Sequence, residues 1–145
     1  MPNTRKKIAS RSVQYAALPW RRKKSETEVM LITSRHTGRW IVPKGWPMKR
    51  KAPHAAAARE ALEEAGVVGQ IGKEPIGSFS YRKLLKQGRA IDCEVEVFPL
   101  EVTRQRKTWP EKGKRKVQWL SLSDASKTVQ EPVLRAIIRK LRKRR

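Results

Sequence analysis

The chain has 145 residues, 38% of them hydrophobic and five of them tryptophan, which is enough for one globular domain with a buried core. Its 35 Lys and Arg residues far outnumber its 13 Asp and Glu residues, and the net charge of +22 indicates a polyanionic partner such as nucleic acid, a phosphate-rich small molecule or an anionic membrane surface. The single cysteine, Cys93, excludes an internal disulfide and fits a reducing compartment. No stretch approaches the roughly 20 apolar residues of a membrane span. We therefore expect a cytoplasmic protein.

The first half of the chain is predicted to form strands that lead into one helix. Apolar runs separated by turn residues predict strands at 13–19, 29–33 and 40–43, with a polar turn at 21–26. Pro53 suits the first position of a helix that runs to Ala65, and Gly66 suits its end.

The second half is predicted to return to strands and to end in another helix. Apolar residues predict strands at 76–81, 90–102 and 117–122, the first two joined near residues 86–88. Pro132 opens a helix with one apolar stripe, formed by Val133, Leu134, Ile137, Ile138 and Leu141. The domain is expected to cover residues 12–141, between a basic arm at residues 1–11 and a basic tail at residues 142–145.

Three carboxylates gather on one face of the central helix. At about 100° per residue, Glu60, Glu63 and Glu64 fall within an arc of roughly 100°, at spacings where like charges destabilise a helix. Glu63 and Glu64 also lie in the last turn before Gly66, at the negative end of the helix dipole. In a strongly cationic chain this placement indicates a missing positive partner, and a divalent metal is the natural candidate.

The sequence around these glutamates resembles the Nudix box. The box consists of a glycine, five residues, a glutamate, seven residues, and then Arg-Glu-aliphatic-any-Glu-Glu-any-Gly-aliphatic. Here Gly45 is followed by five residues, Lys51, seven residues, and the run from Arg59 to Val67. Two positions depart from the pattern, because Ala61 is smaller than the usual aliphatic residue and Lys51 replaces the first glutamate.

The flanking segments are similar to particular Nudix subfamilies. Residues 34–45 resemble the segment that leads into the box of the diphosphoinositol polyphosphate phosphohydrolases, and residues 91–119 are similar to the end of that subfamily's domain. The run Pro43-Lys44-Gly45 is also similar to that of diadenosine polyphosphate hydrolases. The resemblance implies the α/β class, with an α/β/α sandwich around a mixed β-sheet and a box that forms a loop–helix–loop.

The resemblance also implies a chemistry, the metal-assisted attack of water on a phosphoanhydride. Carboxylate oxygens suit Mg²⁺ or Mn²⁺, and by position the metal ligands are Glu60, Glu63, Glu64 and the carbonyl of Gly45. One glutamate acts as general base towards the water, and that catalytic role stays open between Glu60 and Glu64. Arg59 pairs with Glu63 at i,i+4 and orients it.

The substrate side of the site is implied in the same way. Four residues match the segment that meets phosphates in the inositol pyrophosphate enzymes, namely Ser34, Arg35, Arg39 and Lys44. We therefore expect a polyphosphorylated small molecule of the inositol pyrophosphate or diadenosine polyphosphate type. Trp46, directly beside Gly45, is the tryptophan best placed to line the mouth of the site.

Several alternatives stay open at this point. Lys51 either weakens the site, contacts a substrate phosphate, or marks a non-catalytic basic Nudix-fold protein that binds polyanions. A pyrophosphohydrolase of nucleotides or RNA 5′ ends is a further alternative. Glu94 and Glu96 share one face of a strand and form either its exposed polar side or a source of an extra ligand or base. The basic arm and tail are either solvated or a weak attachment site for nucleic acid or anionic lipid.

Overall fold

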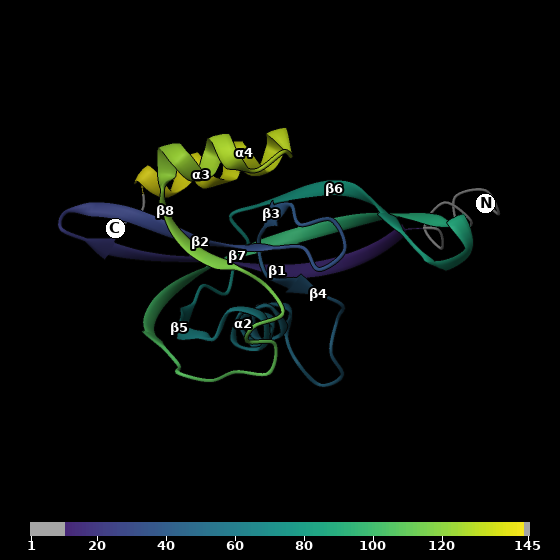
Figure 1. Ribbon diagram of the computed structural model, residues 1–145, viewed down its shortest axis with the longest axis horizontal. Helices are drawn as coiled ribbons and strands as arrows, with labels where there is room; N and C mark the ends of the chain where they lie inside the picture. Colours follow the sequence, from purple (N-terminus) through teal and green to yellow (C-terminus); the bar gives the residue numbers. More distant parts are fainter. Residues whose placement is uncertain (1–10, 144–145) are drawn as a thin grey trace.

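A computed structural model describes residues 11–143 of the chain. One sheet lies between two helical layers: α2 (Pro53–Ala65) covers one face, and α3 (Leu122–Thr128) and α4 (Pro132–Lys140) cover the other (Figure 1). This arrangement confirms the expected α/β/α sandwich. Within the described residues no helix is long and apolar enough to cross a membrane. The predicted basic arm, apart from its last residue, and the end of the predicted tail lie outside the described residues.

Eight strands form one mixed sheet. Their bounds are β1 Arg11–Lys23, β2 Glu26–Thr33, β3 Trp40–Ile41, β4 Lys44–Gly45, β5 Val67–Ile71, β6 Gly77–Leu84, β7 Ala90–Gln105 and β8 Val117–Ser121. The central path is β3-β2-β1-β7-β5, and β4 is added to β1, β6 to β7 and β8 to β2. Strands β1 and β7 are parallel, whereas the other described pairs are antiparallel. Short 3-10 turns at Lys86–Gly88 and Leu141–Lys143 complete the described chain.

Alternate side chains of the sheet fill two hydrophobic cores. Along β7, Val95 and Val97 belong to the core under α3 and α4, whereas Phe98 and Leu100 belong to the core under α2. Burial of a large apolar side chain of this kind stabilises the fold by about 1.5–3 kcal/mol. Cys93 is also buried and carries a free thiol. Both faces of the central strands are therefore covered, which holds the helices firmly on the sheet.

Helix α2 has the bounds that the sequence predicts. Pro53 occupies the first turn, where its missing N–H is not needed, and Gly66 ends the helix in the left-handed conformation at φ 74°. The N–H of Gly66 donates to the carbonyl of Leu62. Ala61 and Ala65 are fully buried against the sheet, and such small side chains let the helix approach it closely. The helix that carries the glutamates is thus fixed at its end and along its length.

Several strands are longer or shorter than predicted, and the largest differences concern the turn at 21–26 and the strand at 40–43. The predicted turn at residues 21–26 is shorter, because β1 and β2 stay paired as far as Lys23 opposite Glu26, and the turn consists of Lys24 and Ser25 with positive φ. The strand predicted at 40–43 is divided, because β3 ends at Ile41 and the next residues pair with β1 instead. Pro43, which has no N–H to donate, stands between the two short strands.

Two elements had no sequence prediction, β5 and α3. Strand β5 contains Gly69, where a Cβ would lie 1.9 Å from the carbonyl oxygen of Glu101, so only glycine permits this close pairing with β7. In the sequence the same glycine indicates a loop rather than a strand. Helix α3 begins directly after β8, where the hydroxyl of Ser121 accepts from the N–H of Asp124.

Candidate active site

The glutamates of α2 lie against the short strand β4. A Cβ on Gly45 would be 2.1 Å from Oε2 of Glu60, so the Glu60 carboxylate occupies the space that any larger residue would need. The N–H of Lys44 donates to Oε1 of Glu64 at 3.3 Å. Because β4 is paired with β1 at Tyr15 and Ala16, both carboxylates are held against the middle of the sheet.

The pKa values of Glu60 and Glu64 are both raised above those of free glutamate. Burial, opposed by Arg115 but reinforced by Glu60 and Glu111, raises the pKa of Glu64 to about 8. Burial also raises the pKa of Glu60, and Glu63 and Glu111 add to the effect, while a hydrogen bond with Glu64 and the charge of Arg115 oppose it. Burial is the main cause of both raised pKa values, and a bound cation would favour the ionised form of both acids.

A divalent cation fits this pair of acids. Two carboxylates set against main-chain atoms offer hard oxygen donors, and Mg²⁺ in particular is commonly held by one or two carboxylates together with water and substrate phosphates. The glycine at residue 45 provides the room for Glu60. Within residues 11–143, no three Asp, Glu, His or Cys side chains already form a metal-binding group. Further ligands would come from the Gly45 carbonyl, Glu63, water or substrate.

The other predicted box residues lie around the pair. Nε of Arg59 donates to Oε2 of Glu63 at 2.7 Å, so the predicted i,i+4 pairing is present. The Glu63 side chain is 31% exposed and is joined to Arg59 rather than to the other two glutamates. Lys51 is exposed on the loop before α2. The structure therefore brings Glu60 and Glu64 together and leaves Glu63 and Lys51 at the margin.

Sequence reasoning missed two residues of the site, Glu111 and Arg115. Arg115 is nearly buried and faces Oε2 of Glu64 at 3.6 Å and Oε1 of Glu111 at 2.8 Å. Both lie in the connection between β7 and β8, far from the box in sequence. The sequence offers one indication of these residues, which is that Glu111 is an acid within an otherwise cationic segment. That observation does not predict which residue Glu111 or Arg115 contacts.

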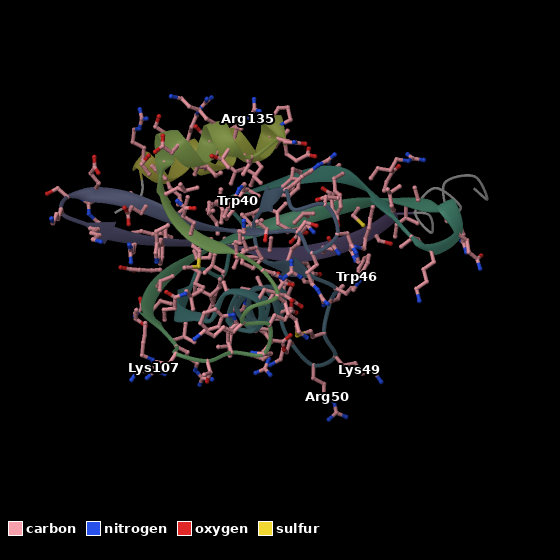
Figure 2. The ribbon with its side chains drawn as sticks, in the orientation of Figure 1. Trp40, Trp46, Lys49, Arg50, Lys107 and Arg135 are labelled. Carbon is pink, nitrogen blue, oxygen red and sulfur yellow. The ribbon has the colours of Figure 1, made fainter. Side chains whose placement is uncertain are left out.

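A cavity of about 330 Å³ lies on the face of the sheet that α3 and α4 cover, and Lys44 is the residue of its lining that also contacts Glu64. Three of the four predicted substrate residues line it, namely Ser34, Arg39 and Lys44, whereas Arg35 does not. Aromatic side chains form part of the wall: Trp40, Phe79 and Tyr81. In Figure 2, Trp40 lies between the sheet and the α3–α4 layer, and Trp46 lies apart from it on the loop that leads to Lys49 and Arg50. Trp40 rather than Trp46 therefore lines the cavity.

Lys44 connects the cavity to the carboxylates. Its main-chain N–H contacts Glu64, while its ammonium group lies 4.8 Å from the centroid of the Tyr81 ring in the cavity wall. Burial lowers the pKa of Lys44, and the nearby charge of Lys83 lowers it further. Lys44 is thus shared by the cavity wall and the surroundings of Glu64.

Glu94 and Glu96 lie on β7, on the same face of the sheet as α2. Register places Glu96 opposite Tyr15, and Tyr15 is opposite Gly45, so Glu96 and Gly45 stand in one row across three strands. Adjacent strands are about 4.8 Å apart, which puts the two backbones roughly 10 Å from each other. Glu94 accepts a weak hydrogen bond from Ser78 at 3.5 Å. Both acids are half-buried, and the choice between a polar strand face and an extra acid stays open.

Comparison with protein families matches residues 12–141 to the NUDIX domain. Nudix hydrolase 21, chloroplastic, from Arabidopsis thaliana is 35% identical over 122 residues, which cover 81% of this chain and 60% of the relative. Diphosphoinositol polyphosphate phosphohydrolase 3-alpha from Mus musculus is 36% identical over 126 residues, which cover 83% of this chain and 73% of the relative. The chain thus spans about 60% of the length of the Arabidopsis relative.

Solved structures share the fold. An Ap4A hydrolase from C. elegans, in a binary complex, superposes with a TM-score of 0.65 at 19% identity and covers 90% of this chain and 94% of its own. The NUDIX domain of Shewanella oneidensis NrtR, complexed with ADP ribose, gives a TM-score of 0.66 at 15% identity and covers 90% of this chain and 87% of its own. At such identities the likeness concerns the fold alone.

Proposed function

This chain belongs to the Nudix domain family, and from that premise we propose that it is a hydrolase that cleaves phosphoanhydride bonds with the help of Mg²⁺ or Mn²⁺. One observation carries the proposal. The carboxylates of Glu60 and Glu64 are packed together against β4, and both have raised pKa values that a bound cation would lower again. Such a pair is costly for the fold unless a cation joins it.

The residues of the box would divide metal binding, proton transfer and positioning among them. Glu60 and Glu64, with Glu63 and the Gly45 carbonyl, would hold the ion, which would neutralise phosphate oxygens and lower the pKa of a nearby water. Either Glu60 or Glu64 accepts the proton of the attacking water, and the role of general base stays open between these two residues. Arg59 holds Glu63 in place through its 2.7 Å ion pair.

The substrate we propose is a polyphosphorylated small molecule of the inositol pyrophosphate or diadenosine polyphosphate type. Support comes from the cations that line the cavity and from Lys44, which both lines the cavity and contacts Glu64. The names of the mouse relative and of the C. elegans structure point to the same two substrate types. We further propose a cytoplasmic location, in keeping with the free thiol of Cys93.

A panel of phosphoanhydrides tests the proposal. Purified protein with Mg²⁺ or Mn²⁺ is given inositol pyrophosphates, diadenosine polyphosphates, nucleoside triphosphates and triphosphate-ended RNA, with Glu64→Gln as the inactive control. We expect turnover of the first two classes and a loss of roughly 100-fold or more in the control, because an oriented carboxylate is lost. Turnover of RNA ends alone would replace the proposed substrate class. Binding of all polyanions without turnover would favour a non-catalytic protein, with Lys51 as the mark of lost activity.

A further inference from the structure

The connection between β7 and β8, residues 106–116, closes over the C-terminal end of α2. The N–H of Arg106 donates to the carbonyl of Gly66 at 2.8 Å, and the N–H of Glu111 donates to the carbonyl of Glu63 at 3.0 Å. Just before the connection, the side-chain amide of Gln105 donates to the carbonyl of Ala65 at 3.2 Å. The last carbonyls of a helix have no partners within the helix, so these bonds tie the connection to the helix end.

A tryptophan seals the same contact. A Cβ on Gly66 would lie 2.2 Å from the ring of Trp109, so the ring rests directly on the glycine that ends the helix. The connection can approach this closely only because residue 66 has no side chain. The helix end and the connection therefore form one packed unit, and the position of each sets the position of the other.

Arg115 extends this unit to the carboxylate of Glu64. Its guanidinium donates to the carbonyl of Thr33 at 3.1 Å and to Oε1 of Glu111 at 2.8 Å, and it faces Oε2 of Glu64 at 3.6 Å. The Arg115 side chain is only 12% exposed. A planar guanidinium holds its five N–H donors in a rigid fork, whereas a lysine ammonium is a compact charge with three rotatable donors, so arginine can fix its partners in set directions.

Both oxygens of Glu64 are consequently engaged. Oε1 accepts from the N–H of Lys44 at 3.3 Å, and Oε2 faces Arg115. One partner belongs to β4 and the other to the connection, so the carboxylate is held from two sides. Glu111 completes the arrangement, since it fixes Arg115 through the shorter of the two ion pairs.

We propose that Arg115 is a positioning residue, which fixes the Glu64 carboxylate in the orientation that the metal requires and is itself fixed by Glu111 and Thr33. The inference rests on the proposed function, since it assumes a divalent ion at Glu64. Without Arg115, Glu64 would lose one of its two supports, and Glu60 and Glu64 would lose a positive charge that offsets the neighbouring acids. Partners of this kind behind a metal ligand change metal affinity or activity by roughly 10- to 100-fold.

The test measures Mn²⁺ binding to the metal-free protein by titration calorimetry, beside kcat and KM. We expect Arg115→Ala to weaken Mn²⁺ binding roughly 10-fold or more and to lower kcat by a similar factor, with KM for substrate at saturating metal changed less than about threefold. Arg115→Lys keeps the charge without the fork and should recover part of the loss. Arg21→Ala is the matched control, because Arg21 is also a partly buried arginine, paired with Glu28 and stacked on Trp119, but remote from the box.

A second variant keeps the test decisive if Arg115→Ala fails to fold. Glu111→Gln preserves the size of its side chain, loosens the fixing of Arg115 and removes a charge that acts on Glu60 and Glu64, and we expect weaker Mn²⁺ binding by about two- to tenfold. Mn²⁺ affinity unchanged in both variants would overturn the positioning role while leaving the proposed function intact. A rise in KM with unchanged Mn²⁺ affinity would overturn it in favour of a direct substrate contact. A wild-type protein that binds no Mn²⁺ and hydrolyses nothing would overturn the proposed function itself.

Discussion

At the scale of single residues, the site depends on the absence of one side chain. The Glu60 carboxylate fills the place where a Cβ of residue 45 would be, at 2.1 Å. The spacing of the box predicts that Gly45 and Glu60 belong to one site, and the local i,i+4 rule predicts the Arg59–Glu63 pair. The contact of Glu64 with Arg115 could not be predicted, because it depends on the path of a connection that begins forty residues later.

Gly45→Ala should affect both the stability of the fold and the activity of the site, and the two effects can be measured separately. We expect a loss of about 1–3 kcal/mol in the free energy of unfolding and of roughly 100-fold in kcat/KM, because the carboxylate must move by about an ångström. Denaturant unfolding and steady-state kinetics measure the two effects. In a Glu60→Ala background the added methyl group meets no carboxylate, so the stability cost of Gly45→Ala should nearly vanish. An equal cost in both backgrounds would show that Glu60 is not the group displaced.

At the scale of elements, the proline and glycine residues at the ends of a helix decide how well the sequence predicts its bounds. Pro53 and Gly66 mark both ends of α2 by fixed backbone preferences, and the predicted bounds are correct. Strand β5 was not predicted, because Gly69 reads as a loop residue although it permits the close pairing with β7. The sequence predicts one strand at 40–43 where the structure has β3 and β4, because these two strands differ only in their partners: β3 pairs with β2, and β4 pairs with β1. Local signals thus give the helix, and sheet contacts decide the short strands.

The packing of α2 makes a prediction at this scale. Ala61 stands where the box usually has a larger aliphatic residue, and it is fully buried in the core under α2. We expect Ala61→Leu to lower the free energy of unfolding by about 1–3 kcal/mol, because the extra methylenes must push the helix from the sheet. Ala58→Leu, on the half-buried side of the same helix, is the control and should change stability by less than half as much. A stabilising Ala61→Leu would mean that the core has room that the structure does not show.

At the scale of the whole molecule, the resemblance gave the α/β/α sandwich correctly, while the cavity was beyond sequence reasoning. Its walls come from the β2–β3 loop, from β6 and from the start of α4, segments as far apart as Ser34 and Leu134. The predicted residues Ser34, Arg39 and Lys44 do line it, yet nothing local relates them to Tyr81. The net charge of +22 indicates a polyanionic ligand, but it cannot say which surface binds it. Topology supplies part of that information, because Lys44 both lines the cavity and contacts Glu64.

The central claim is that Glu60 and Glu64 form a pair that binds a divalent cation, and the free energy of unfolding tests it. A carboxyl whose pKa is raised from 4.5 to about 8 on folding stabilises the fold below pH 4.5, and that contribution is lost as the pH rises towards 8. Each such proton changes stability by at most roughly 1.4 kcal/mol per pH unit. Mn²⁺ binds the deprotonated pair, so its stabilising effect should grow over the same pH range.

The decisive measurement is therefore the free energy of unfolding of metal-free protein from pH 5.5 to 8.5, for wild type and Glu64→Gln, with and without Mn²⁺. We predict that wild-type stability falls with rising pH, that the fall is much smaller in Glu64→Gln, and that saturating Mn²⁺ removes it in wild type only. Parallel pH profiles for the two proteins, or no stabilisation of wild type by Mn²⁺, would contradict the account.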